Sequence, residues 1–416
     1  MFTKKITPFT CIVIAILVCL TTCVAVSSIS SVGEKQSVND SRLDSADLTK
    51  YADLLKYVGD DYEKFEKLAY ILTVIDTFYV HDYDVEQLWN DIYTSLPMLL
   101  GDEYSQYFSI EDYNELIDSS DSDFVGIGVH VSYDVDTEGV YVFGVMPNSP
   151  ALKAGVQVGD IIVNVEGIES TEENYYKLLD AVRGEAGSNV KITVLRGEER
   201  IELNLTRAAV EAENVLYQKL DNNTAYVRIL SFAYTNVADE FTKKIALAQS
   251  EGCDKFIFDV RHNGGGFLDQ ICKVLDLLLP EGPIINIVDK NGKTTTQNSD
   301  SNCITAEMVV LCNEGTASAA ELFTAALRDY KLAKIVGVTT FGKGSMQSTR
   351  ILPDGSAIKL SSALYNPPSN VSYDKIGIKP DYEIDLSDEW KDRYFKMPIE
   401  EDVQLQKAIE LFGSAD

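Results

Sequence analysis

The sequence EMVVLCNEGTASAAELFTAALRDY, residues 307–330, changes its hydrophobic period within a few positions. Its first part is a continuous apolar run, Met308 to Cys312, which is typical of a buried strand. A short polar loop follows, and from about Ser318 the apolar residues recur at three- and four-residue steps, which predicts a helix. A buried strand that leads directly into a helix is the repeating unit of an α/β sheet.

The neighbouring sequence repeats this order. Strand-like runs TAYVRILSF, KFIFDVR and AKIVGV alternate with helical patterns at 236–249 and 267–279. This alternation predicts an α/β domain in which at least some strands are parallel. A hairpin with an Asp354-Gly355 turn follows the last of these strands.

The sequence before this domain has two other patterns. From Leu48 to Leu116 the apolar residues follow a helical period, and from Phe124 several short runs alternate as strands, with one helix at about Glu173 to Val182. The fold class is therefore mixed α/β, with a helical module, a β-rich domain and an α/β domain. We divide the chain into 1–30 (signal peptide or membrane anchor), 31–44 (linker), 45–119 (helical region), 120–208 (β-rich domain), 209–390 (α/β domain) and 391–416 (helical tail).

The N-terminal segment has the features of a targeting sequence. Lys4 and Lys5 precede an apolar run from about Phe9 to Val26. Three fates are open: a retained anchor, cleavage near Ala25, or lipidation at Cys23. Each of them predicts an extracytoplasmic protein, membrane-anchored or secreted, of a bacterial cell envelope.

Composition excludes several functions. Lys plus Arg total 36 against 65 Asp plus Glu, a net charge of -29, which argues against nucleic acid as a partner. The seven cysteines include no C-x-x-C pair, so the sequence indicates no zinc site, and we expect no cofactor. A disulfide among the last four cysteines is left open.

Ser318 is a candidate nucleophile. At the start of a helix a serine meets unpaired backbone N–H groups, including that of Ala319, which can bind an oxyanion. The alternative is structural, because Ser318-x-x-Glu321 has the spacing of a capping box. This segment alone favours the capping role.

Lys343 is a candidate base in the Gly-rich loop TTFGKGSMQ. A lysine can act as a base if burial lowers its pKa, whereas an ordinary loop lysine is solvated. The same stretch fits G-x-x-x-x-G-K from Gly337, but Gly344 stands where a nucleotide-binding loop needs Ser or Thr. A P-loop nucleotide hydrolase is therefore disfavoured.

A second Gly-rich loop follows the strand KFIFDVR. Gly264, Gly265 and Gly266 can turn backbone N–H groups toward an anion, or can form only a flexible turn. Of three histidines, only His262 adjoins such a loop, and no G-x-S-x-G pattern occurs, so a Ser–His–Asp triad is poorly supported.

Together, in this order, these segments resemble the C-terminal processing peptidases, the tail-specific protease family with a Ser–Lys dyad. The family's nucleophile segment is similar to NEGTASAAE and its base loop to TTFGKGSMQ. Its D-x-R-x-N-x-G-G segment is matched, with Gly264 in place of the usual proline. The matching residues are Asp259, Arg261, Asn263, Gly265 and Gly266. Upstream, LLGDEYSQYFS resembles the family's D-P-H-S-x-Y segment, with Glu103 and Tyr104 in place of Pro and His.

The β-rich domain resembles the family's PDZ domain. The most specific stretch is MPNSPALKAGVQVGDIIVNVEG, and the FVGIG stretch is similar to a carboxylate-binding loop. A PDZ domain binds a chain end by adding it as a strand. The resemblance implies peptide binding by Val125, Gly126, Ile127, Gly128 and Val129.

The resemblance, over roughly residues 65 to 390, implies a serine endopeptidase that recognises protein C-termini and needs neither ATP nor metal. Ser318 would be the nucleophile and Lys343 the base, positioned by Gln347, with Asp329 as a possible supporting residue. The oxyanion hole would consist of Ala319 with Gly265 and Gly266. Expected partners are protein or peptide substrates with exposed C-termini, the membrane, and a second copy of the chain. The alternative is an inactive PDZ-bearing scaffold.

Overall fold

The computed structural model describes residues 61–120, 123–211, 213–220 and 223–413. The chain forms two compact units, Met1–Trp89 and Asn90–Asp416. The apolar N-terminal run lies outside the described residues, so its three fates and the predicted localisation stay predictions. Within the described part, no helix is long and apolar enough to cross a membrane.

The helical region largely follows its prediction. Helices α3 (Tyr62–Phe78), α4 (Val85–Met98) and α5 (Ile110–Ser120) lie in it. Between α4 and α5, however, Gln106–Phe108 forms strand β1, which the helical prediction missed. β1 pairs with residues 357–359 of β18 (Ala357–Asn366), a partner about 250 residues away that no local pattern can indicate.

The β-rich domain has a sheet in the order β3-β4-β5-β7-β8, with β6 (Ile168–Glu169) paired to β5. Its strands are β3 (Val129–Asp134), β4 (Gly139–Val145), β5 (Ile161–Val165), β7 (Asn189–Arg196) and β8 (Glu199–Thr206). Helices α6 (Pro150–Ala154) and α7 (Tyr175–Val182) cover a core that includes Val140, Ile162, Leu178 and Ile192. Among the described residues β3 pairs only with β4, which makes it an edge strand of this sheet.

The first strand-like run of this domain, FVGIGVHVSYD, forms two strands in the structure. β2 (Asp123–Gly126) pairs with β9 (Ala208–Glu211), and β3 begins after Ile127 and Gly128. Gly128 has φ +75°, and a Cβ there would lie 2.4 Å from the Ser149 Cβ. The chain turns there because a glycine tolerates both conditions.

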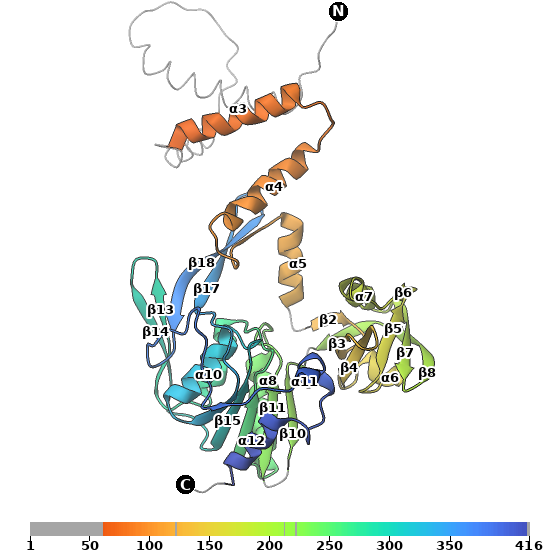
Figure 1. Ribbon diagram of the computed structural model, residues 1–416, viewed down its shortest axis with the longest axis vertical. Helices are drawn as coiled ribbons and strands as arrows, with labels where there is room; N and C mark the ends of the chain where they lie inside the picture. The colour runs from red at the N-terminus through yellow and green to blue at the C-terminus, as the bar shows by residue number, and fades with distance from the viewer. Residues whose placement is uncertain (1–60, 121–122, 212, 221–222, 414–416) are drawn as a thin grey trace, which may run out of the picture. The chain divides into compact units, whose positions relative to one another are not determined.

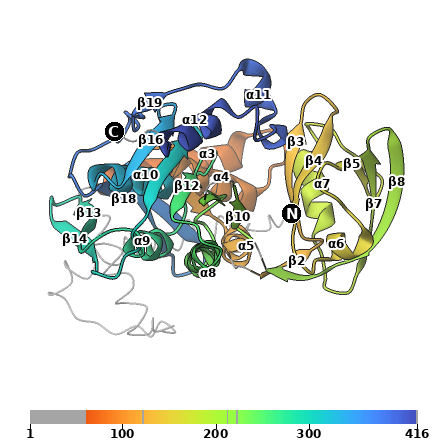
Figure 2. The ribbon, with the colours of Figure 1, turned by 90° about the horizontal axis from the view of Figure 1, so that it is seen from below.

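The α/β domain is built on a sheet in the order β10-β11-β12-β15-β16-β19. Its strands are β10 (Val215–Lys219), β11 (Thr224–Ile229), β12 (Lys255–Asp259), β15 (Glu307–Cys312), β16 (Ala333–Gly337) and β19 (Tyr382–Glu383). The strands from β11 to β19 are parallel and β10 is antiparallel, which confirms the predicted partly parallel sheet. Figures 1 and 2 show these elements from two sides.

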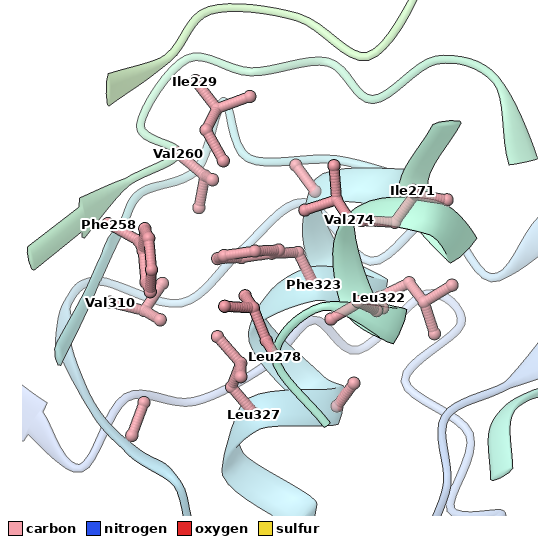
Figure 3. Close-up of a cluster of buried hydrophobic side chains, with 14 of the residues drawn as sticks. Ile229, Phe258, Val260, Ile271, Val274, Leu278, Val310, Leu322, Phe323 and Leu327 are labelled. Carbon is pink, nitrogen blue, oxygen red and sulfur yellow. The ribbon is translucent and has the colours of Figure 1, made fainter. Parts of the chain in front are cut away.

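Alternate residues of the central strands bury opposite faces of this sheet. Phe256 and Phe258 of β12 pack with the helices α8 (Val237–Ser250), α9 (Leu268–Asp276) and α10 (Ala319–Asp329), as Figure 3 shows for part of this core. Ile257 packs on the other side with α12 (Val403–Leu411). Burial on both faces is expected of a parallel sheet. The parallel pairing of β12 with β15 places the carboxyl ends of these two strands at the same edge.

A second sheet carries the predicted hairpin. β17 (Ser345–Ile351) and β18 form its two strands, and β13 (Gly282–Asp289) and β14 (Thr294–Ser299) extend it. Near the C-terminus lie the short helix α11 (Asp388–Asp392) and the 3-10 turn η2 (Tyr394–Lys396).

Candidate active site

Ser318 lies at the N-terminus of α10, just after the carboxyl end of β15. Its backbone has φ 55° and ψ -119°, which is uncommon for a residue with a side chain and indicates that the surrounding loop imposes it. The loop is held by β12 and the chain after it: Thr316 donates to the Val260 carbonyl at 2.8 Å, and the Ala317 N–H to the Asn263 carbonyl at 2.9 Å. The strained serine is therefore held by contacts from distant segments.

The Glu321 carboxylate joins the Ser318 loop to the Lys343 loop. Its Oε2 accepts the backbone N–H of Ser318 at 3.0 Å and that of Lys343 at 2.7 Å. Its Oε1 accepts from Thr340 and from the Gly342 N–H, each at 2.6 Å. Burial raises the pKa of this carboxyl, although the four hydrogen bonds favour its charged form.

This arrangement changes how the capping-box spacing is understood. Glu321 does bind the Ser318 N–H, as that spacing predicts, but it also binds the lysine loop. The Glu321 side chain therefore caps the helix and also holds the Ser318 and Lys343 loops together. Sequence reasoning treated Glu321 only as a cap, because no local pattern shows what a buried carboxylate meets across the fold.

Tyr365 is a site residue that sequence reasoning missed. Its hydroxyl donates to the Lys343 carbonyl at 2.7 Å. Burial raises the pKa of the Tyr365 phenol to about 12, while the neighbouring side chains of Ser318 and Tyr373 act in the opposite direction. The phenol is thus neutral at ordinary pH and touches both candidate catalytic residues.

Tyr365→Phe is expected to lower kcat by about 10- to 100-fold, with little change in KM. The substitution removes the hydroxyl that binds the Lys343 carbonyl beside Ser318, and a buried acceptor left without its donor costs about 1–3 kcal/mol. Steady-state cleavage of a labelled peptide measures it. An unchanged kcat, with a folded variant, would show that the Tyr365 hydroxyl is structural.

The Lys343 amine lies over the face of another tyrosine, 4.1 Å from the centre of the Tyr104 ring. No hydrogen bond joins it to the Ser318 hydroxyl in this structure. Burial lowers the pKa of the amine, and the charge of Lys359 adds to this effect. The lowered pKa is the direction that a general base requires.

The Gly-rich loop lies directly against Ser318. A Cβ on Gly265, which has φ +96°, would lie 2.7 Å from the Ser318 Cβ. The Gly265 N–H donates to the Asn263 side chain at 2.9 Å, so this donor is engaged. Within the described residues, the N–H groups of Ala319 and Gly266 have no such partner, which makes them the better oxyanion donors. The oxyanion hole stays a prediction.

The two residues expected to position the base lie in different places. The Gln347 amide donates to the hydroxyls of Ser345 and Ser361, at 3.1 and 3.0 Å, on the hairpin beside Lys343. Asp329 is the last residue of α10, about 16 Å along the helix from Ser318 at 1.5 Å per residue. Its carboxylate binds the Ser369 N–H and Arg328 instead. The structure does not bring Asp329 to the dyad.

The expected peptide-binding residues surround the start of the edge strand β3. Val125 and Gly126 are paired in β2, and Ile127 is buried with its carbonyl accepting the Ala151 N–H. Gly128 makes the turn, and Val129 opens β3. The carboxylate loop and an open strand edge are therefore adjacent, although their role in binding remains a prediction.

The other side chains with potential reactivity, His262 and the cysteines, do not form a second reactive site in the described residues. The His262 ring is hydrogen-bonded to the Asn313 side chain at 2.8 Å and packs on Tyr394. The four cysteines of the described residues are free thiols, so the disulfide left open is not formed there. No group of side chains suited to a metal ion occurs among the described residues.

Comparison with known proteins identifies the class. A model of peptidase family S41 matches residues 223–384, and a PDZ domain model matches residues 141–196. The carboxy-terminal processing protease CtpA of Bacillus subtilis (strain 168) is 32% identical over 338 residues, covering 80% of this chain and 71% of that protein. The chain is a serine peptidase of family S41 with a PDZ domain.

Other relatives agree. A probable CtpA-like serine protease of Staphylococcus haemolyticus (strain JCSC1435) is 29% identical over 329 residues, 78% of this chain and 66% of that protein. The chain thus spans about two thirds of the length of this relative. The structure of a putative S41 protease from Bacteroides fragilis NCTC 9343 has a TM-score of 0.55 at 19% identity, covering 82% and 93% of the two chains, and shows the same fold.

Proposed function

We propose that this chain is a serine endopeptidase in which Ser318 is the nucleophile and Lys343 the general base. One observation carries the assignment. A single oxygen of Glu321 accepts the backbone N–H groups of both Ser318 and Lys343, so the two residues, 25 positions apart, belong to one site. Burial of the Lys343 amine and the imposed backbone of Ser318 support the same roles.

The proposed reaction needs only groups of the chain. Neutral Lys343 takes the proton of the Ser318 hydroxyl as its oxygen attacks the scissile carbonyl. In this proposal the N–H groups of Ala319 and Gly266 bind the oxyanion. The protonated lysine then gives its proton to the leaving amine, and later the neutral lysine activates the water that releases the acyl group. No step uses ATP or a metal ion.

We assign the choice of substrate to the PDZ domain. An extended C-terminus can add to the free edge of β3, with its carboxylate at the loop formed by Ile127 and Gly128. Substrates are then proteins or peptides with accessible C-termini. The predicted membrane association, extracytoplasmic localisation and homodimer rest on the sequence alone and stay predictions.

Cleavage of an unfolded protein, in buffer with EDTA and without ATP, tests this function. The wild type is expected to cleave, and Ser318→Ala and Lys343→Ala are each expected to lose activity by at least about a thousandfold, as for members of a catalytic unit. Binding of a C-terminal peptide should be retained in both variants. Equal cleavage by all three proteins would exclude the dyad. Peptide binding without cleavage by any of them would support the alternative, an inactive scaffold.

A further inference from the structure

Tyr104 holds the amine of the proposed base. The Lys343 Nζ lies 4.1 Å from the centre of the Tyr104 ring, within the range of a cation–π contact. We propose that Tyr104 is a positioning residue that binds the protonated form of Lys343 and so restrains it from acting as the base. This inference rests on the proposed Ser–Lys function and adds a restraint to it.

The Tyr104 ring is presented by a well-anchored segment between α4 and α5. The Asp102 carboxylate accepts the Tyr104 N–H at 3.2 Å and also binds the Ser105 hydroxyl. The Ser105 oxygen in turn accepts the Ser361 N–H of β18 at 3.2 Å. Directly after it, β1 pairs with β18. Because the segment is fixed to the same hairpin that follows Lys343, the ring is held over the amine.

The contact discriminates between the two protonation states of the lysine. The ring face attracts an ammonium group through its quadrupole, and a neutral amine gains little from it. Burial and a hydrogen bond to Glu103 raise the pKa of the Tyr104 phenol to about 12, so the ring is uncharged at neutral pH. A neutral ring that favours the ammonium form opposes deprotonation of Lys343.

Charged groups on three elements also face the Lys343 amine. Lys359 of β18 disfavours its protonated form. Asp102 and Glu103, from the Tyr104 segment, and Glu321 of α10 favour it. The Tyr104 ring therefore favours the protonated form of Lys343, as the carboxylates do, and opposes the effect of burial on the Lys343 pKa. Tyr365 contacts the Ser318 side chain and the backbone carbonyl of Lys343, whereas the Tyr104 ring lies at the Lys343 amine.

The pH dependence of kcat/KM tests the restraint. In Tyr104→Leu the ring face is lost, so the pKa of Lys343 should fall and the rising limb of the profile should move to lower pH by about 0.5–1 unit. Below the limb, cleavage should then be about 3- to 10-fold faster than in the wild type. Tyr104→Phe keeps the ring and should restore the wild-type limb. Tyr107→Leu, in the same segment but packed against Tyr93, is the matched control and should not move the limb.

A second measurement keeps the test independent of turnover. In full-length Ser318→Ala protein with 13C-labelled lysine, the Lys343 pKa can be followed by NMR, with and without Tyr104→Leu. A lower pKa in the double variant supports the restraint, and an unchanged or higher pKa overturns it. If Lys343→Ala cleaves like the wild type, the dyad itself fails. If Lys343→Ala is inactive but Tyr104→Leu leaves the limb in place, the dyad stands and only this inference fails.

Discussion

Gly265→Ala is expected to lower kcat/KM by at least about a hundredfold. The new Cβ would lie 2.7 Å from the Ser318 Cβ and 2.8 Å from the Ala319 nitrogen, so the nucleophile and its neighbouring oxyanion donor must move. A displacement of about 1 Å at a reacting group is enough for an effect of this size. The backbone at φ +96° adds strain for any residue with a side chain. Cleavage of a labelled peptide measures the loss.

Gly264→Ala is the matched control for this prediction. The two glycines are adjacent, but a Cβ at Gly264 would meet nothing within 4 Å, and its φ is not in the left-handed region. Its kcat/KM should change by less than about threefold. If both variants lose activity equally, the flexibility of the loop, and not its closeness to Ser318, accounts for the effect.

Arg261→Leu is expected to lower the free energy of unfolding by about 3–5 kcal/mol. The buried guanidinium binds the carboxylates of Asp259 and Asp402, each at 2.7 Å, and the Gln404 side chain at 2.8 Å. Without the guanidinium, two buried carboxylates lose their counter-ion. The loss of stability from such an uncompensated buried charge is far larger than the net contribution of an intact buried ion pair. Because Asp402 caps α12, this network also ties the C-terminal helix to the sheet.

Denaturant unfolding measures this loss, with Lys273→Leu as the control. Lys273 pairs with Asp269 at 3.6 Å, but both side chains are more than 60% exposed, so less than about 1 kcal/mol is expected there. Similar destabilisation by the two variants would show that the buried Arg261 network contributes no more to stability than an exposed ion pair.

The Arg261 network also sets how the protein responds to acid. Burial alone raises the pKa of Asp259, but the charge and hydrogen bonds of Arg261, the charge of Arg228 and a hydrogen bond from Tyr226 outweigh it and hold that pKa well below its usual range. A depressed carboxyl pKa stabilises the fold fully above the unfolded value of about 4, and this contribution is lost only as the pH falls through the lower folded value. Arg261→Leu removes this contribution, so its deficit in the free energy of unfolding relative to the wild type should be largest near neutral pH and should shrink as the pH falls below about 4.

The parts of the fold that follow local periodicity could be predicted from sequence. The alternating strands and helices of the α/β domain, including α8 and α10, lie close to their expected ranges, and so does the hairpin around Gly355. The helix expected at 267–279 is shorter in the structure, Leu268–Asp276. Strand β1 and the break between β2 and β3 could not be predicted, because one depends on a distant partner and the other on the space beside Ser149.

The candidate site divides in the same way. Ser318, Lys343 and the Gly265 loop stand in sequence patterns, since a helix start and Gly-rich loops have local signatures. Tyr365 has none, and Tyr104 stands in a segment that resembles a family motif but gives no local sign of a contact with Lys343. The first reaches the site through the pairing of β17 with β18, and the second through the anchoring of its segment to the same hairpin.

By itself, the sequence determined the class of this protein, a PDZ-bearing serine peptidase, and named its two candidate catalytic residues. The tertiary structure decided what surrounds them: Glu321 joining their backbones, Tyr365 contacting both, and Tyr104 under the lysine amine. The physical reason is range. Hydrophobic period and turn chemistry act over a few residues, whereas burial and hydrogen bonding at a site depend on segments that only folding brings together.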